Sequence, residues 1–371
     1  MRLRAFERAH PGLEIVSQRL PSASDTLHQY YLTALEGGAR HFDVLVADVI
    51  WIAEFARAGW IADLTEWFPP SRIRNEFVAG AADTVIVGER TFAVPWYVDV
   101  GLLYYRRDLT EPPRSTNDLE SIATAARARD ASMRGYVWQG RQAEGLVCVG
   151  CEAVWAFGGD ALRGQRVVID TAEARAGLAW LRQLVGRGVS PVATLSADEE
   201  ASRRLFSDGR VVFMRNWPYA WRVFQREGSA LRDRVAVASI PTVNGAPGAG
   251  ALGGWQLAVN AHIPRWKRRI ASELIASLTT PESGIDLAVA YGRNPPQRAA
   301  YADPRLAREA PFIAQLAPFV HAARPRPVTP YYNVVADTLQ SEFSAIVTGV
   351  RPVRDALARA QRRIDDVMEV A

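Results

Sequence analysis

Aromatic, acidic and basic side chains follow short apolar stretches at five places in the chain. The stretch VVFMRN at 211–216 has the composition of a buried strand, yet it runs directly into Trp217, Pro218 and Tyr219, where small turn residues are usual. The other four places present Asp48 after VLVA, Trp96, Tyr97 and Asp99 in VPWYVDV, Gly254 and Trp255 in GGWQ, and Arg324, Arg326, Tyr331 and Tyr332 in RPRPVTPYY. In α/β proteins the carboxyl ends of strands border the crevice where ligands bind, so we expect these side chains to serve one site.

The combination of aromatic rings with carboxylates and arginine predicts a carbohydrate ligand. A pyranose ring has an apolar face of C–H groups that can lie flat on an indole or phenol ring. Its rim of hydroxyls can be fixed by charged side chains through strong, directional hydrogen bonds. Gly254, beside Trp255, would let a sugar approach the backbone closely.

Each of these residues also has a structural interpretation when it is taken alone. A single Trp at a strand end is more often part of a core than a ligand platform. Asp48 is also placed to cap a helix over 49–59, and Arg326 could pair with a surface acid. The repetition of the pattern at five places favours the binding site. Trp155, Trp180 and Trp221 lie at helical spacing among apolar residues and are predicted to pack in the core.

Composition excludes several other classes of function. The 371 residues carry a formal net charge of +4, and the basic residues are scattered among acids, whereas a nucleic-acid binder would gather them on one face. No run approaches the roughly 18 to 20 apolar residues that cross a bilayer. No arrangement of histidine and cysteine predicts a metal site, and no cofactor motif is present.

Cys148 and Cys151 form a CxxC in GLVCVGCEAVWAFGG. This spacing suits a thioredoxin-like dithiol or half of a zinc site, but no second cysteine pair exists and the five histidines are dispersed. We expect small packing residues of a helix, or a small disulfide in an oxidising compartment.

The elements that position these residues alternate between helix and strand, which predicts an α/β protein with two lobes. A helix ends at His10, LEIVSQ at 13–18 alternates like a strand, and FDVLVAD at 42–48 has the apolar run of a buried strand. Further helices are expected after a cap at Ser115 or Thr116 in PPRSTNDLESIATAARA, and at 24–36, 49–59, 144–157, 171–187, 197–206, 264–278, 281–290, 303–320, 329–346 and 352–369. A hairpin-like segment is expected at 83–95, followed by the run DVGLLYYRRDL at 99–109, and further strands are expected near 135, 167, 211 and 255.

The chain resembles the extracellular solute-binding proteins of family 1, the sugar receptors of ABC importers, and within them the trehalose/maltose-binding branch. The stretches that carry the resemblance, in order, are FERAHPGLEIV, DTLHQYYLTALEGG, FDVLVADVIWIAEFARAGWIADL, FAVPWYVDVGLLYYRRDL, NWPYAW, GGWQLAVN and RPVTPYYNVVADTLQSEFSAIVTG. They cover nearly the whole chain. Each is weak by itself, and the ordered set is specific for the family and less specific for the sugar.

The resemblance implies a type II periplasmic-binding-protein fold, in which two α/β lobes of discontinuous chain are joined by a hinge and close over the ligand. The lobes would be 1–104 plus 259–302 and 105–258 plus 303–371. The ligand contacts that it implies are Asp48 from the first lobe, Trp96 and Asp99 from the segment that crosses between the lobes, and Gly254 and Trp255 near the hinge. From the second lobe it implies Glu144, Trp217, Tyr219, Arg326 and Tyr331. The implied partners are a disaccharide such as trehalose or maltose and the permease subunits of an ABC transporter.

The start of the chain differs from the pattern of the family. Relatives carry a signal peptide, often with a lipidated cysteine, and a first strand that precedes the first helix; here Met1 falls inside that helix. The resemblance therefore implies an exported, periplasmic protein or lipoprotein, whereas the sequence taken literally predicts a cytoplasmic chain without its first strand.

Two other functions compete with a sugar receptor that makes and breaks no bond. A glycoside hydrolase would need two carboxyl groups flanking one glycosidic bond, and Asp48 and Glu144 are expected on opposite lobes. A receptor for a different glycoside or a polyol would use the same residue types. A phosphate ligand is disfavoured, because no helix start combines Ser, Thr and Gly with arginine.

Overall fold

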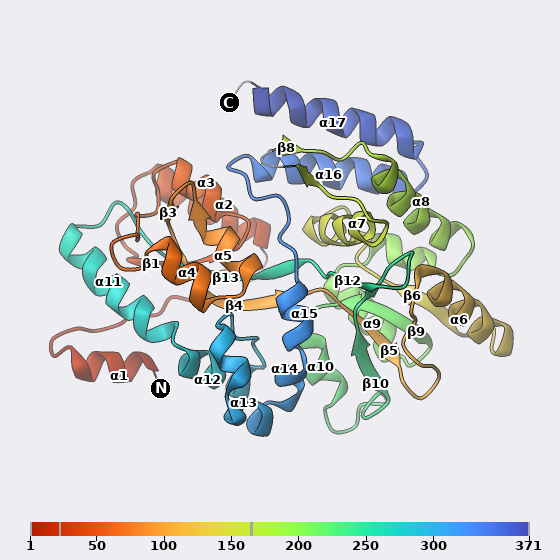
Figure 1. Cartoon of the computed structure of the whole chain (residues 1–371), viewed down its shortest axis with the longest axis horizontal. Helices are drawn as coiled ribbons and strands as arrows, with labels where there is room; N and C mark the ends of the chain where they lie inside the picture. The colour runs from red at the N-terminus through yellow and green to blue at the C-terminus, as the bar shows by residue number, and fades with distance from the viewer. Residues whose placement is uncertain (1, 22–23, 164–165, 370–371) are drawn as a thin grey trace. The chain divides into compact units, whose positions relative to one another are not determined.

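The computed structural model describes residues 2–21, 24–163 and 166–369, and its elements are drawn in Figure 1. The chain forms two compact units, each assembled from separate segments. Unit 1 comprises 1–99, 253–321 and 328–330, and unit 2 comprises 100–252, 322–327 and 331–371. The predicted α/β class is confirmed in both units. The lobe boundaries inferred from the sequence stay a prediction.

Unit 1 is organised around a three-stranded sheet with the order β1-β13-β4. The strands are β1 (Val44–Asp48), β13 (Leu252–Val259) and β4 (Val94–Val100), and β2 (Ile86–Val87) forms a small hairpin with β3 (Arg90–Thr91). The helices of this unit are α1 (Arg2–Ala9), α2 (Ser24–Glu36), α3 (Ile52–Arg57), α4 (Pro70–Glu76), α5 (Ala79–Val85), α11 (Arg265–Leu278), α12 (Pro281–Tyr291), α13 (Pro304–Glu309), α14 (Pro311–Gln315) and α15 (Ala317–Ala322), the last ending at the unit boundary, with a 3₁₀ turn at Arg298–Ala302.

The antiparallel pair β1 and β13 places Asp48 opposite Trp255. Leu45 and Ala47 of β1 are fully buried, and they pack in one core with the aromatic side chains Trp51 and Phe55 that follow. Burial alternates along VLVAD, so Leu45 and Ala47 enter this core while Val44, Val46 and the terminal Asp48 are only partly buried.

Unit 2 contains a four-stranded sheet with the order β10-β5-β9-β6. Its strands are β5 (Leu102–Arg106), β6 (Arg134–Val137), β9 (Val211–Asn216) and β10 (Val235–Ala238), with the short pairs β7 (Leu162–Arg163) and β8 (Arg166–Val167), and β11 (Ile240–Pro241) and β12 (Pro247–Gly248). The helices are α6 (Thr116–Arg129), α7 (Glu144–Ala156), α8 (Ala172–Gly186), α9 (Glu199–Ser207), α10 (Tyr219–Phe224), α16 (Tyr332–Val347) and α17 (Val353–Glu369), with a 3₁₀ turn at Val192–Ser196. All six residues of β9 are buried, as expected for an apolar run between two neighbouring strands.

Most predicted elements are present within a few residues of their expected bounds, and two are not. The segment 13–18 forms no strand. The helix expected over 303–320 is divided into α13, α14 and α15, because Pro304, Pro311 and Pro318 interrupt it and two of these prolines begin new helices. Ser115, rather than Thr116, caps α6, since its hydroxyl accepts a hydrogen bond from the backbone N–H of Asp118.

Cys148 and Cys151 lie in α7 as free, buried thiols in the core of unit 2. Burial raises the pKa of Cys148 to about 12 and raises that of Cys151 as well, so both remain protonated and unreactive near neutral pH. Trp155 and Trp180 pack in the same core, as predicted. Trp221 is partly exposed on α10. None of the described helices is both long and apolar enough to cross a bilayer.

Candidate functional site

The first group of predicted site residues lies where strands of unit 1 end. Asp48 closes β1, and Trp255 lies opposite it on β13. The backbone N–H of Val49 donates a 3.2 Å hydrogen bond to the carbonyl of Gly254, which extends the pairing one residue beyond the strand. Asp48 also accepts weak hydrogen bonds of 3.4 Å from the hydroxyl of Ser24 and the backbone N–H of Ile50. The helix cap considered for Asp48 is not formed, since α3 has Trp51 at its N-cap position.

Strand β4 contributes Trp96, Tyr97 and Asp99 beside this pair. An Arg293 guanidinium nitrogen lies 3.8 Å from an Asp99 carboxylate oxygen, and the guanidinium lies 4.7 Å from the centre of the Tyr97 ring. The rings of Trp96 and Tyr97 are 5.4 Å apart. We call Asp48, Trp96, Tyr97, Asp99, Trp255 and Arg293 the unit 1 cluster.

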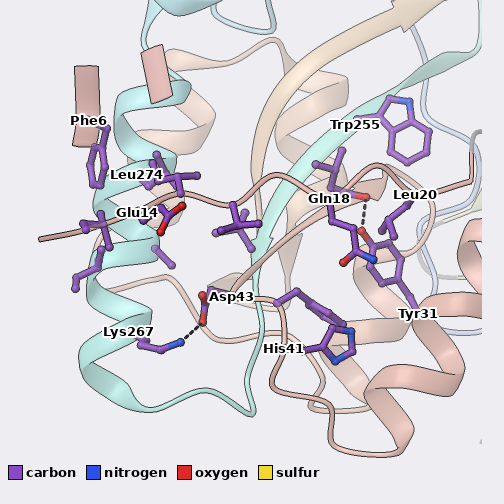
Figure 2. Close-up of a pocket in the computed structure, with 18 of the residues that line it drawn as sticks. Phe6, Glu14, Gln18, Leu20, Tyr31, His41, Asp43, Trp255, Lys267 and Leu274 are labelled. Atoms are coloured by element: carbon purple, nitrogen blue, oxygen red, sulfur yellow. Dashed lines mark hydrogen bonds and ion pairs between the residues drawn. The ribbon is translucent and has the colours of Figure 1, made fainter. Parts of the chain in front are cut away.

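Trp255 is held edge-on by a deeper tryptophan. Its ring centre is 5.7 Å from that of the buried Trp51, with the two planes at 87°. Trp255 itself is only partly buried, and with Tyr97 and Arg293 it borders a cavity of about 830 Å³ (Figure 2). The indole is therefore fixed in orientation and open to a ligand.

Gly254 adopts a backbone conformation within the sheet that residues with a side chain rarely adopt. Its φ of +126° is in the region that glycine tolerates, and a Cβ atom there would lie 2.4 Å from the carbonyl oxygen of Tyr97. A side chain at 254 would thus separate β13 from β4 and displace Trp255. The close approach of a sugar to the backbone of Gly254 stays a prediction.

Burial raises the pKa of Asp99 to about 6, the Arg293 charge opposes this rise, and the Asp48 charge adds to it. A buried carboxyl beside both a cation and a second carboxylate is the arrangement that brings ionisation close to physiological pH. Above pH 6 the ionised Asp99 can accept hydrogen bonds from hydroxyl groups.

The raised pKa gives a prediction about stability. The folded chain keeps the Asp99 proton up to about pH 6, whereas the unfolded chain releases it near the ordinary aspartate pKa of 3.8, so ionisation of Asp99 lowers the stability of the fold as the pH rises through this window. Asp99→Asn has no carboxyl to titrate at this position. The difference in the free energy of unfolding between the variant and the wild type should therefore shift by about 2 to 3 kcal/mol in favour of the variant between pH 4 and pH 7. Urea denaturation of both proteins at several pH values measures the difference; a constant difference would contradict the raised pKa.

The second group lies in unit 2 around Glu144, the first residue of α7. Two donors reach the same Glu144 carboxylate oxygen: a guanidinium nitrogen of Arg326 at 2.5 Å and the hydroxyl of Tyr332 at 2.5 Å. Arg326 also donates a 3.3 Å hydrogen bond to the carbonyl of Leu252 and is buried, so the alternative of a surface ion pair is wrong. The amino end of α7 favours the negative charge of Glu144.

The aromatic residues after β9 contact the acids of α9. Trp217 donates a 3.5 Å hydrogen bond from its indole nitrogen to Glu199, and its ring lies 4.1 Å from the guanidinium of Arg215. Tyr219 donates a 3.4 Å hydrogen bond to Glu200. The apolar strand β9 is thus followed directly by aromatic residues because their polar atoms find hydrogen-bond partners on α9. The interior of the sheet would offer no such partners.

The two parts of the second group are neighbours. A Cβ atom on Gly145 would lie 2.8 Å from a carboxylate oxygen of Glu199, so the partner of Trp217 lies beside the residue that follows Glu144. We call Glu144, Glu199, Trp217, Tyr219, Arg326 and Tyr332 the unit 2 cluster. Tyr331 is at the N-cap position of α16, directly before Tyr332. Arg324 instead pairs with Asp160, at 2.7 Å, outside the cluster.

Two members of these clusters were not predicted as site residues. Arg293 lies in an irregular stretch after α12, and Glu199 begins α9; neither follows a predicted strand. Tyr332 was named together with Tyr331, but the resemblance implied a ligand contact for Tyr331 only, because a tyrosine pair gives no sign of which hydroxyl points inward. Among the described residues, no group of His, Cys, Asp and Glu side chains is arranged to hold a metal ion.

Residues 3–285 match the model of a family described as bacterial extracellular solute-binding protein. The chain is 32% identical over 345 residues to a probable ABC transporter-binding protein of Deinococcus radiodurans, covering 89% of this chain and 81% of that protein.

The fold is similar to those of solved sugar receptors. The maltose-bound structure of T. maritima MalE3 is 36% identical, has a TM-score of 0.87, and is matched over 99% of this chain and 95% of that chain. The GacH receptor of Streptomyces glaucescens, studied unliganded and with acarbose, is 19% identical with a TM-score of 0.84 over 99% and 94% of the two chains, which shows a shared fold alone. These similarities confirm the predicted type II periplasmic-binding-protein fold.

Proposed function

This chain belongs to the bacterial extracellular solute-binding proteins, and we propose that it is a receptor that binds a disaccharide and presents it to the permease of an ABC importer. Maltose is our first choice of ligand, because a relative that is 36% identical over 99% of this chain has maltose bound. Trehalose is the second choice, since both disaccharides consist of two glucose rings with the same kind of apolar face.

The observation that carries the proposal is the unit 1 cluster. Trp255 offers an indole face whose orientation Trp51 fixes, and Asp48 lies opposite it in the strand register. An aromatic platform for the C–H face of a sugar and a carboxylate for its hydroxyls therefore occur side by side. Asp99 and Arg293 add an acceptor and a donor.

The unit 2 cluster supports the same ligand class. Glu144, Arg326 and Tyr332 form one hydrogen-bonded set, and Trp217 and Tyr219 supply rings next to carboxylates. Both units thus combine the residue types that neutral sugars require, and we propose that both contact the ligand. In keeping with the family, the receptor makes and breaks no bond, and we propose that it acts outside the cytoplasm, next to its permease and with a lipid anchor.

Isothermal titration calorimetry with maltose, trehalose and sucrose tests the function. We expect micromolar or tighter binding of one disaccharide. Asp48→Asn in unit 1 and Arg326→Lys in unit 2 should each weaken it at least tenfold, because each changes a charge-assisted hydrogen bond. Arg324→Lys is the matched control for Arg326, since it makes the same change two residues away on a partly exposed side chain paired with Asp160.

The outcomes separate the parts of the proposal. A folded protein that gives no heat with any of the three sugars would overturn the ligand class. If Asp48→Asn weakened binding and Arg326→Lys did not, the unit 2 cluster would not be part of the binding site. Release of glucose from maltose by a large excess of protein would show an enzyme instead of a receptor.

A further inference from the structure

The loop between β11 and β12 contains an asparagine followed by a glycine. The two strands pair antiparallel, so residues 242–246 form the turn of a hairpin, and Asn244 and Gly245 are exposed on it. Asn244 is the one asparagine of the chain that precedes a glycine. At such a step the carbonyl carbon of the side-chain amide is close along the chain to a backbone nitrogen that no neighbouring side chain shields.

The side-chain amide of Asn244 is folded back onto this turn. Its oxygen Oδ1 accepts a 3.1 Å hydrogen bond from the backbone N–H of Ala246. This hydrogen bond closes a ring of atoms that includes both Cγ of Asn244 and the backbone nitrogen of Gly245. The two atoms that could react with each other are therefore held within one small turn.

A second donor, the hydroxyl of Thr242, lies 2.8 Å from the same Oδ1 atom. The hydroxyl oxygen is also 2.6 Å from the carbonyl oxygen of Ala246, and its single hydrogen can serve either acceptor. Thr242 is 8% exposed, and its own carbonyl accepts a 3.1 Å hydrogen bond from the N–H of Thr116, which fixes its position. If negative charge developed on Oδ1, the hydroxyl would turn fully to it, so the turn favours an anionic oxygen over a neutral amide oxygen.

The backbone nitrogen of Gly245 is only weakly hydrogen-bonded. Its N–H donates to the carbonyl of Thr242 at 3.4 Å, beyond the usual range of an N–H···O hydrogen bond. Gly245 has a φ of +81°, a conformation that suits glycine, and it has no Cβ atom beside this nitrogen. Loss of the proton and movement of the nitrogen toward Asn244 therefore sacrifice little native interaction.

We propose that Asn244 is a site of spontaneous deamidation, with Gly245 as the nucleophile and Thr242 and Ala246 as the donors that hold the oxyanion. The Gly245 nitrogen loses its proton to water and attacks Cγ of Asn244, and the electron pair of the C=O bond moves to Oδ1. When the carbonyl re-forms, the Cγ–Nδ2 bond breaks, and the amide nitrogen takes up a proton from water and leaves as ammonia. Water then opens the resulting cyclic imide at either carbonyl, which gives aspartate or isoaspartate.

The products differ from asparagine in charge and, for isoaspartate, in the path of the main chain. Both products carry a carboxylate where the neutral amide was. Isoaspartate also adds one carbon atom to the main chain between positions 244 and 245. Because the same turn accepts the hydrogen bond from the N–H of Thr116, we expect the added atom to change a contact at the amino end of α6.

Mass spectrometry of the folded protein during incubation at neutral pH tests the proposal. Deamidation makes the peptide that contains residue 244 heavier, because an oxygen atom replaces an NH group. Thr242→Val keeps the shape of the side chain and removes the hydroxyl. We expect it to react about two to ten times more slowly than the wild type, the factor that corresponds to the net contribution of one hydrogen bond. Thr242→Ser should react faster than Thr242→Ala by a similar factor, and this second pair separates the hydroxyl from any packing defect of the valine variant.

The wild type and Thr242→Val, both unfolded in urea, are the controls. They should react at equal rates, because the hydroxyl is positioned beside Oδ1 only in the folded hairpin. Asp208 also precedes a glycine, but an aspartate can isomerise without becoming heavier, so it does not contribute to the measurement.

Three outcomes would contradict the proposal. Equal rates within both folded pairs of proteins would overturn the role of Thr242, and a difference that persisted in urea would do the same. An Asn244 that stayed intact in the folded wild type while it reacted in urea would overturn the proposal as a whole. The readout uses no sugar, so it does not depend on the proposed function.

Discussion

Replacement of Trp255 by alanine should weaken maltose binding about a hundredfold while the protein stays folded. A hundredfold loss corresponds to about 2.7 kcal/mol, the size expected when an aromatic platform that a ligand covers completely is removed. The indole is already oriented by Trp51, so the wild-type protein loses little side-chain entropy when the sugar binds. Isothermal titration calorimetry of the two proteins measures the change.

Trp266→Ala is the matched control for Trp255. It removes the same side chain from the same unit, but Trp266 is 61% exposed on α11. We expect less than a twofold change in maltose affinity. Trp255→Phe should keep part of the affinity, because a smaller ring still offers an apolar face. If Trp255→Ala bound maltose as tightly as the wild type, the unit 1 cluster would not be the sugar platform.

The sequence predicted the fold, and it placed several residues of the candidate site at the ends of strands and helices, because both depend on local patterns. The buried strands β1 and β9 are continuous apolar runs, and the residues that follow them are fixed in position once the strand is fixed. Asp48 and Trp217 could therefore be placed at strand ends without knowledge of the tertiary structure. Glu144 also begins a helix that was predicted from its apolar residues.

The residues that the sequence did not reveal depend on contacts between distant segments. Arg293 joins the unit 1 cluster because the chain after α12 returns to β4, 194 positions from Asp99 in sequence order. Tyr332, rather than Tyr331, bonds Glu144 because of the direction in which α16 begins. No periodicity encodes either contact.

The wrong prediction at 13–18 has a related cause. A β-strand is defined by the partner that completes its hydrogen bonds, and no described strand lies beside LEIVSQ. Sequence patterns report the preference of a segment, and the ladder requires a second segment as well.

Neutralising Glu152 should have the largest effect on stability. Arg215 is 0% exposed and Glu152 is 3% exposed, and Arg215 donates hydrogen bonds of 2.6, 2.9 and 3.2 Å to the Glu152 carboxylate. The backbone N–H of Ala251 donates a further hydrogen bond of 2.9 Å to Glu152. Burial by itself lowers the pKa of Arg215, but the charge and hydrogen bonds of Glu152 outweigh it and raise the pKa, so the guanidinium stays charged. Glu152→Gln keeps the shape of the side chain and leaves this cation without a counter-charge. We expect a loss of about 3 to 5 kcal/mol in the free energy of unfolding, measured by urea denaturation.

A double variant distinguishes the charge from the packing. Glu152→Met with Arg215→Met removes both ions and should recover most of the stability lost in Glu152→Gln, because the cost comes from an unpaired buried charge. Asp160→Asn, which changes a more exposed ion pair with Arg324, should cost less than about 1 kcal/mol. The double variant should nevertheless bind maltose more weakly than the wild type, since the Arg215 guanidinium also packs against the ring of Trp217. If the double variant were as unstable as Glu152→Gln, the pair would act through its shape and hydrogen bonds rather than through its charges.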